Sequence, residues 1–232
     1  QERVSGRTRR GLAGGVTATV RAVSLGLKPY QPVYQAMQRI ADERLPEAVD
    51  EFWLLQHPPV FTLGLNGSRA HLLRPGQIPV VQCDRGGQVT YHGPGQLVVY
   101  VLLDLERLGL GVRSLVRALE QGVVGLLADY GVVAAGRPDA PGVYVGGAKI
   151  ASIGLRVRRG MTYHGLSLNV DLDLEPFSRI NTCGMRDLKV TRLVDLAERV
   201  DCDRIGSRLV ARLAETLGYD AWSTALDSAL SP

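Results

Sequence analysis

The hydrophobic positions of this chain recur with two periods, and each period predicts a different element. In residues 32–44, 114–130 and 203–217, apolar side chains return every three or four positions, which is typical of a helix with one buried face. The second helix carries the most regular stripe, formed by Leu115, Leu119, Val123 and Leu127. We expect Ser114 to cap that helix, because a serine hydroxyl can accept a hydrogen bond from the first turn.

Shorter apolar segments, bounded by glycine, proline and polar residues, predict strands. They are 19–25, 52–55, 60–63, 80–83, 88–91, 97–103, 132–135, 142–145, 149–157 and 165–170. The sequence DRGG at 84–87 indicates a hairpin between the fourth and fifth strands. The run 97–103 is apolar throughout and predicts a central, buried strand.

A strand-rich middle with helices before, between and after it predicts an α+β (mixed α/β) fold. The chain has 232 residues, of which 45% are hydrophobic, and this suffices for one core without disulfides or metal. We expect a single domain over residues 16–220. Residues 1–15 are expected to be a leader outside the fold, and residues 221–232 a C-terminal tail.

The charge distribution argues against nucleic acid as a partner. The net charge is +4, but residues 1–15 hold four arginines and one glutamate, so three of these charges lie in the expected leader. No membrane segment is expected either, since the longest apolar run, 97–103, is far shorter than the roughly 20 residues that span a bilayer.

Three widely spaced cysteines, Cys83, Cys183 and Cys202, form no C-x-x-C pair. This pattern disfavours a disulfide framework or a metal site and favours a reducing, cytoplasmic setting. Cys183 stands before Gly184 in a polar loop. It is therefore a better candidate nucleophile than the other two, which we expect at the end of a strand and the start of a helix.

A thiol nucleophile needs a cation or a base beside it, because a free thiol is mostly protonated at neutral pH. Lys149 is one candidate: it is one of only three lysines among 27 basic residues, and it lies between small and apolar neighbours that predict a buried stem. His92 and His164 are the others, and either would form a Cys-His pair. The residues alone leave this choice open.

The segment 85–96, with the sequence RGGQVTYHGPGQ, contains five glycines and prolines. Glycines let a ligand lie directly against the main chain, so this segment suits one wall of a pocket for a long, thin ligand. It matches neither of the glycine patterns that bind phosphate. Its tetrapeptide Thr-Tyr-His-Gly, residues 90–93, occurs again at residues 162–165.

At these segments the chain resembles the octanoyltransferases of lipoate biosynthesis, the lipoyl(octanoyl)transferase B family. The resemblance extends from about Thr19 to Leu217 and rests on four ordered motifs, at 85–96, 149–154, 164–169 and 183–184. The chain departs from the family in three places. Thr182 stands where proline usually precedes the cysteine, Arg192 where serine is common, and Gln56 where an acidic residue is frequent.

The resemblance implies the catalytic-domain fold of biotin and lipoate protein ligases, a mixed sheet flanked by helices. It implies that Cys183 takes the octanoyl group from octanoyl-acyl carrier protein as a thioester, with Lys149 as its acid-base partner. The implied acceptors are lysines of the lipoyl domains of dehydrogenase E2 subunits and of the glycine cleavage H protein. Because transfer from a thioester to an amide is downhill, neither ATP, another cofactor nor a metal is expected.

The resemblance also implies which residues line the acyl pocket. They are Arg85, Gly86, Gly87, Gln88, Val89, Thr90, Tyr91, His92, Ser152, Ile153, Gly154, His164, Gly165 and Leu166. An acidic carrier protein predicts a basic patch on the enzyme, and the hairpin with Arg156, Arg158 and Arg159 is the candidate.

Two other functions fit the same fold. An ATP-dependent lipoate or biotin protein ligase would need an adenylate site and would not require Cys183. In a non-catalytic acyl-binding protein, Cys183 would be structural.

Overall fold

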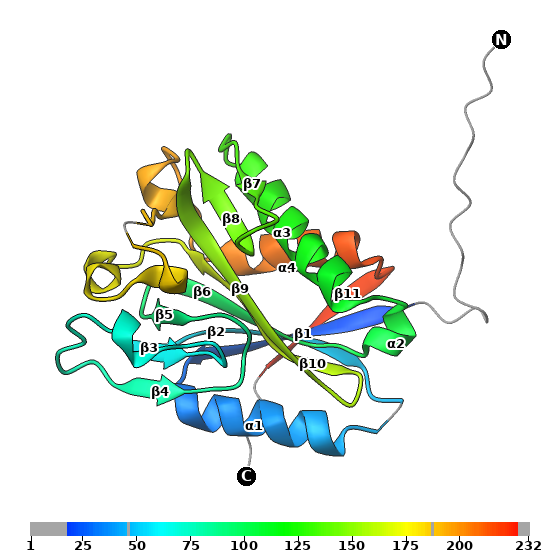
Figure 1. The fold of residues 1–232 in the computed structure, drawn as a ribbon. Helices are drawn as coiled ribbons and strands as arrows, with labels where there is room; N and C mark the ends of the chain where they lie inside the picture. Colours follow the sequence, from blue (N-terminus) through cyan, green and yellow to red (C-terminus); the bar gives the residue numbers. More distant parts are fainter. Residues whose placement is uncertain (1–17, 46, 187, 227–232) are drawn as a thin grey trace.

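The computed structural model describes residues 18–45, 47–186 and 188–226. A mixed sheet of eight strands forms the centre, and helices cover both of its faces (Figure 1). A second sheet of three strands lies beside it. The expected α+β fold is confirmed, whereas the expected leader, residues 1–15, lies outside the described residues.

The large sheet has the strand order β11-β1-β2-β6-β10-β9-β8-β7. Its strands are β1 (Thr19–Leu27), β2 (Asp50–Gln56), β6 (Gln96–Leu102), β7 (Ala135–Gly136), β8 (Gly142–Val145), β9 (Ala148–Arg158), β10 (Met161–Asn169) and β11 (Ala221–Leu226). The first three in spatial order are parallel to one another, and every later neighbour is antiparallel. The strand predicted at 97–103 is β6, near the middle of the sheet.

Helices pack on the two faces through the stripes that the sequence predicts. One face is covered by α1 (Tyr30–Glu43), and the other by α3 (Val112–Ala128) and α4 (Ile205–Leu217), as Figure 1 shows. The four stripe residues of α3 are fully buried, and burial of each such side chain contributes about 1.5 to 3 kcal/mol to the free energy of unfolding. Ser114 is not the cap, because α3 begins two residues earlier, after Gly111.

The small sheet corrects the predicted hairpin. Its order is β4 (Val80–Gln82), β3 (Val60–Leu63), β5 (Val89–His92), so the third strand lies between the two that we expected to pair. Segment 84–87 therefore crosses over β3 instead of closing a tight turn. The strand expected at 132–135 is also misplaced, since β7 is only Ala135–Gly136.

The expected C-terminal tail is wrong for residues 221–226. They form β11, which pairs in parallel with β1 from Thr19↔Ala221 to Ser24↔Leu226. Sequence periodicity missed this strand because it lies at the edge of the sheet and carries a weak apolar pattern. The domain therefore extends beyond residue 220.

A buried carboxylate at the start of β2 joins several of these elements. Asp50 is 2% exposed and accepts hydrogen bonds from Arg44 at 2.8 Å, Arg107 at 2.5 Å and the Tyr219 hydroxyl at 2.6 Å. The backbone N–H of Asp104 donates to the same carboxylate at 3.0 Å. Asp50 thus joins the end of α1, the short helix α2 (Leu105–Leu108) and the segment before β11.

Candidate active site

A cavity of about 280 Å³ lies where β9 and β10 meet the glycine-rich segment and the start of α3. It contains both candidate catalytic residues, Cys183 and Lys149, and every predicted pocket residue except Tyr91. The predicted residues that line it are Arg85, Gly86, Gly87, Gln88, Val89, Thr90, His92, Ser152, Ile153, Gly154, His164, Gly165 and Leu166.

Tyr91 does not line the cavity. Side chains alternate between the two faces of a strand, and β5 directs Thr90 and His92 to the cavity. The Tyr91 ring instead packs on the other side, 5.5 Å from Phe61 and 5.6 Å from Phe177 between ring centroids. Its role is in the small core beneath the glycine-rich segment.

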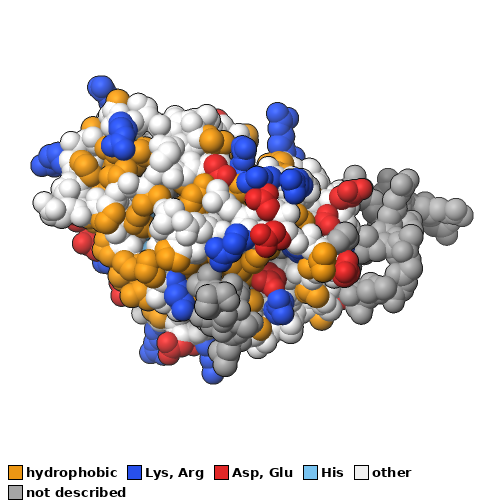
Figure 2. Space-filling view, turned by 90° about the horizontal axis from the view of Figure 1, so that it is seen from below, with side chains coloured by type: hydrophobic (Ala, Val, Ile, Leu, Met, Phe, Trp, Pro, Cys, Tyr) orange, Lys and Arg blue, Asp and Glu red, His pale blue; other side chains and the backbone are white. Residues whose placement is uncertain are grey.

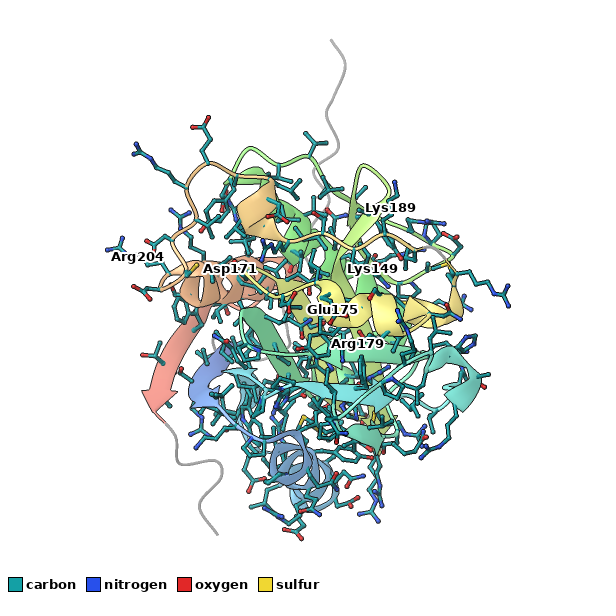
Figure 3. All side chains as sticks on the ribbon, turned by 90° about the vertical axis from the view of Figure 1, so that its left-hand side faces the viewer. Lys149, Asp171, Glu175, Arg179, Lys189 and Arg204 are labelled. Carbon is teal, nitrogen blue, oxygen red and sulfur yellow. The ribbon has the colours of Figure 1, made fainter. Side chains whose placement is uncertain are left out.

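Lys149 and Cys183 are hydrogen-bonded to each other in this cavity. The Lys149 Nζ donates to the Cys183 Sγ at 3.0 Å and to the carbonyl of Pro141 at 2.9 Å. The lysine is 2% exposed, and its Nζ lies 5.3 Å from the centre of the Tyr144 ring. Figure 3 labels Lys149 near the middle of the view, next to Lys189. A buried ammonium can stabilise a thiolate at this distance.

The backbone of Cys183 is strained. It has φ +56° within the 3₁₀ turn η3 (Thr182–Gly184). Among the described residues, three that are not glycine have a positive φ, and two of them, Cys183 and His164, line the cavity. Such strain persists only where surrounding structure holds it, and it is frequent at functional sites.

The two alternative bases are engaged elsewhere. The Nδ1 of His92 shares a hydrogen bond with Gln96 at 2.7 Å, and the Nε2 of His164 shares one with Asp84 at 3.0 Å. Burial lowers the pKa of His92 to about 3 and also lowers the pKa of His164. Within the described chain neither ring bonds to Cys183, so the geometry favours Lys149 as the partner of the thiol.

Asp84 anchors the glycine-rich wall, and the sequence reasoning missed it. Although burial alone would raise the pKa of Asp84, hydrogen bonds from His164, Tyr163 and Tyr34 hold it well below its ordinary value. The Tyr163 hydroxyl donates at 2.5 Å. Because Asp84 directly precedes Arg85, this carboxylate fixes the wall to β10.

Arg85 holds the other side of the same wall. Its guanidinium donates to the carbonyl of Thr62 at 2.7 Å and to the Thr62 hydroxyl at 2.8 Å. The N–H of Gly86 donates to the carbonyl of Leu155 at 2.9 Å. The wall is therefore attached to both β3 and β9, and Arg85 acts chiefly as a cross-link.

Two glycines let the strands approach each other around the cavity. A Cβ on Gly165 would lie 2.1 Å from the carbonyl oxygen of Val99, and one on Gly154 would lie 3.0 Å from that of Gly86. Any side chain at Gly165 would therefore collide with backbone. The two Thr-Tyr-His-Gly copies lie in or at the end of β5 and β10, and each contributes a histidine to the cavity.

The part of the cavity next to α1 is bounded by aromatic rings. Tyr30, His92, Tyr100 and His164 line it, and His57 lies behind them. The His57 ring shares hydrogen bonds with the Tyr100 hydroxyl and the carbonyl of Lys28, both at 2.7 Å, and burial lowers its pKa to about 4.

Several lining residues gave no signal in the sequence, because they belong to ordinary apolar or turn segments that only the fold brings together. They are Tyr30, Val98, Tyr100, Val112, Val116, Ala140, Pro141, Leu155 and Ser167. Within the described ranges, no cluster of three or more His, Cys, Asp or Glu residues could hold a metal ion. No helix in that part of the chain is long and apolar enough to cross a membrane.

Comparison with known proteins shows the family of this chain. Residues 29–214 match the family model described as the lipoyl protein ligase A/B catalytic domain. An octanoyltransferase of Pseudomonas entomophila (strain L48) is 59% identical over 86% of this chain and 93% of its own length. One of Pseudomonas syringae pv. syringae (strain B728a) is 57% identical over 90% of this chain and 96% of its own.

Solved structures show the same fold at low identity. A putative lipoate protein ligase from T. acidophilum with bound lipoic acid superposes with a TM-score of 0.71 at 18% identity, over 90% of each chain. Lipoate-protein ligase A bound with ATP gives 0.73 at 19% identity, also over 90% of each chain. The chain belongs to the lipoyl protein ligase A/B catalytic-domain family. Within that family it belongs to the octanoyltransferases, as its sequence motifs indicate.

Proposed function

We propose that this octanoyltransferase moves an octanoyl group from acyl carrier protein to a lysine of a lipoyl domain through a thioester on Cys183. The observation that carries the proposal is the 3.0 Å contact between the Cys183 Sγ and the Lys149 Nζ, inside a cavity lined mainly by backbone and apolar groups. Such a cavity suits an alkyl chain, and such a pair suits acyl transfer.

In the first half-reaction the Cys183 thiolate attacks the carbonyl carbon of the donor thioester. The new carbon–sulfur bond forms, negative charge develops on the carbonyl oxygen, and backbone N–H groups of the 85–92 wall are the proposed donors to it. Collapse breaks the bond to the carrier's sulfur, and the Lys149 ammonium gives that sulfur a proton. The products are the acyl-enzyme, the free carrier thiol and a neutral Lys149 amine.

In the second half-reaction the amine of the acceptor lysine attacks the carbonyl carbon of the acyl-enzyme. The neutral Lys149 amine takes the proton that the attacking nitrogen loses, and the Cys183 thiolate leaves. An amide has formed, and the thiolate-ammonium pair is restored. Lipoyl domains of E2 subunits and the glycine cleavage H protein are the proposed acceptors.

The two alternative functions use the cavity differently. Ligase relatives of the same fold, such as the structure bound with ATP, are under 20% identical to this chain and share its architecture alone. An ATP-dependent ligase does not require the thiol of Cys183, and in a passive acyl-binding protein this strained cysteine would be structural. The acyltransferase uses both the thiol and the buried lysine beside it.

Intact-mass measurement after mixing the protein with octanoyl-acyl carrier protein tests the proposal. We expect an adduct of one octanoyl group that is lost in Cys183→Ser and discharged by an acceptor lipoyl domain. Absence of the adduct, or its survival in Cys183→Ser, would overturn the proposal. An adduct that forms only with ATP and free octanoate would indicate the ligase instead.

The basic patch suggested by the sequence does not suit the carrier protein. Arg158 forms an ion pair with Asp42 at 2.8 Å, and Arg159 donates to the carbonyl of the same residue. Basic and acidic side chains are intermixed on that face, which Figure 2 views. Arg158 is also nine residues from Lys149 along β9, about 30 Å at the rise of an extended strand.

We propose that the carrier protein docks at the mouth of the cavity, which the exposed lining residues Gly87, Val112 and Pro141 mark. Exposed cations lie on the chain segments that adjoin the lining residues, namely the start of α3, the turn η1 (Arg69–His71) and the chain after Cys183, and within the described residues they form no ion pair. They are Arg69, Arg113, Arg117, Arg186 and Lys189. An acidic carrier would be attracted to this group, which we call the basic rim.

The proposed setting is the cytoplasm. Cys83, Cys183 and Cys202 are free thiols in the structure, which supports a reducing compartment. The proposed reaction consumes no ATP, because the donor thioester already carries the free energy that amide formation needs.

A further inference from the structure

Glu120 is an unexpected residue on the buried face of α3. Its neighbours on that face, including Leu119 and Val123, are apolar and fully buried. Glu120 is buried with them, at 8% exposed, although its side chain is polar. A carboxylate in such a place needs a specific partner. Its Oε1 accepts a hydrogen bond from the backbone N–H of Gly142 at 3.0 Å.

The chain between β7 and β8 folds around this carboxylate. A Cβ on Gly136 would lie 2.7 Å from the Glu120 Oε2, so only glycine lets the backbone come so close. Gly136 and Gly142 stand at the two ends of segment 136–142. Glu120 therefore bonds to one end of the segment, at Gly142, and lies close against the other end, at Gly136.

The same segment determines where the lysine amine lies. The carbonyl of Pro141, one residue before Gly142, accepts a hydrogen bond from the Lys149 Nζ at 2.9 Å. A Cβ on Gly142 would lie 2.5 Å from the Lys149 Cε, so this backbone packs directly on the lysine stem. The Nζ then reaches the Cys183 Sγ at 3.0 Å.

We propose that Glu120 is a positioning residue for the reaction. By accepting from the Gly142 N–H, it aims the Pro141 carbonyl at the Lys149 ammonium and so keeps that ammonium against the Cys183 sulfur. The inference rests on the proposed function, since it assigns Glu120 a role in the same Cys183–Lys149 pair. It predicts that hydrogen-bond acceptance at Oε1, rather than bulk at this position, is what the site requires.

Three variants separate these properties. Glu120→Gln keeps an oxygen that can accept from Gly142, whereas Glu120→Leu keeps bulk without an acceptor. Val123→Ala is the matched control, because it removes buried volume one turn further along α3 from a side chain that carries no hydrogen-bonding group. All three are made in a Cys202→Ser background, so that Cys183 is the accessible thiol and Cys83 stays buried.

The first readout is the rate of iodoacetamide alkylation at Cys183 as a function of pH, followed by mass. We expect Glu120→Leu to react about tenfold more slowly at pH 7, because the thiolate has lost its nearby cation. Glu120→Gln and Val123→Ala should keep the pH profile of the parent. If Glu120→Leu keeps that profile too, or if Glu120→Gln loses it equally, the inference is wrong.

The second readout is steady-state octanoyl transfer. Displacement of a catalytic group by about 1 Å can cost on the order of 100-fold, so Glu120→Leu should lower kcat by that order and leave KM for the donor within about twofold. Gly136→Ala forces a methyl group toward the Glu120 carboxylate, so its kcat should lie between that of the parent and that of Glu120→Leu. A fall in thermal stability without a change in kcat or in alkylation would mean a purely structural role for Glu120.

The alkylation experiment uses no octanoyl substrate, so the two proposals can fail separately. If Cys183→Ser still forms the octanoyl adduct, the proposed function is wrong whatever Glu120 does. If the adduct behaves as expected while alkylation is insensitive to Glu120→Leu, only the inference about Glu120 is wrong.

Discussion

The ε-amino nitrogen of Lys149 lies 3.0 Å from the sulfur of Cys183, although the two residues are 34 positions apart. The chain that follows the cysteine is bonded to the strand that carries the lysine. The N–H of Lys149 donates to the carbonyl of Lys189 at 2.8 Å, and the N–H of Thr191 donates to the carbonyl of Lys149 at 2.9 Å. This short parallel pairing fixes the cysteine turn beside β9.

Lys149→Arg should separate the two halves of the reaction. A guanidinium keeps the positive charge but cannot lose its proton near neutral pH, so it can stabilise the thiolate and cannot act as a base. We expect acylation of Cys183 to persist at a reduced rate, with the carrier's thiolate leaving and taking its proton from water, and transfer to the acceptor lysine to slow by about 10² to 10⁴. Single-turnover mass measurements of each step check this, and full transfer activity in Lys149→Arg would contradict the acid-base role.

Charge reversal on the basic rim should weaken donor binding alone. In the double variant Arg113→Glu and Arg117→Glu, we expect KM for octanoyl-acyl carrier protein to rise about tenfold with kcat unchanged, and the effect to shrink at high salt. Octanoyl-pantetheine, which lacks the carrier protein, should react as before. Arg199→Glu, beside Tyr130 near the far end of α3, is the control. An equal loss with both donors would exclude the rim as a docking surface.

Stability should fall as the pH decreases from about 6.5 toward 4. In the fold, burial lowers the pKa of His57 to about 4 and of His92 to about 3, whereas the ordinary value is 6.5. Below pH 6.5 the unfolded chain therefore binds protons that the folded chain does not, at a cost of about 1.4 kcal/mol per pH unit for each histidine that has fully titrated.

Urea unfolding between pH 7.5 and 4.5 measures this slope. The depressed pKa of Asp84 acts in the same direction, but only below about pH 3.8, its ordinary value, so it does not interfere in this window. Burial also lowers the pKa of His164, so three histidines contribute to the slope. His57→Gln removes one of the three and should make the decline shallower. An identical slope in the parent and in His57→Gln would contradict the assignment.

Removal of the Asp50 carboxylate should lower the free energy of unfolding by several kcal/mol. Asp50→Ala leaves the buried guanidinium of Arg44 and the Tyr219 hydroxyl without their acceptor, and breaking a buried charge pair costs about 3 to 5 kcal/mol. Chemical denaturation measures the loss. Asp195→Ala, which breaks an exposed pair with Arg192, is the control and should cost less than about 1 kcal/mol. Similar losses in both variants would show that the Asp50 cluster adds little to the free energy of unfolding.

Elements with a strong period could be predicted, and those without one could not. The stripe of α3 and the run that forms β6 follow from local spacing, because each buries a face that the spacing defines. The crossing of β3 between β4 and β5 could not be predicted, because strand order depends on long-range pairing. Strand β11 was not predicted because it lies at the edge of the sheet, where one side has no neighbouring strand and the apolar pattern is weak.

The sequence by itself determined the family of this protein, through a glycine-rich segment, one lysine among small residues and a Cys-Gly in a polar loop, in the order that is typical of the octanoyltransferases. Only the tertiary structure placed Lys149, and neither His92 nor His164, within hydrogen-bonding distance of Cys183, because both rings are buried in hydrogen bonds to other residues. It alone turned Tyr91 away from the cavity and brought Glu120 to the backbone behind Lys149. Distance between side chains depends on how strands and helices pack, and residue spacing along the chain does not encode that packing.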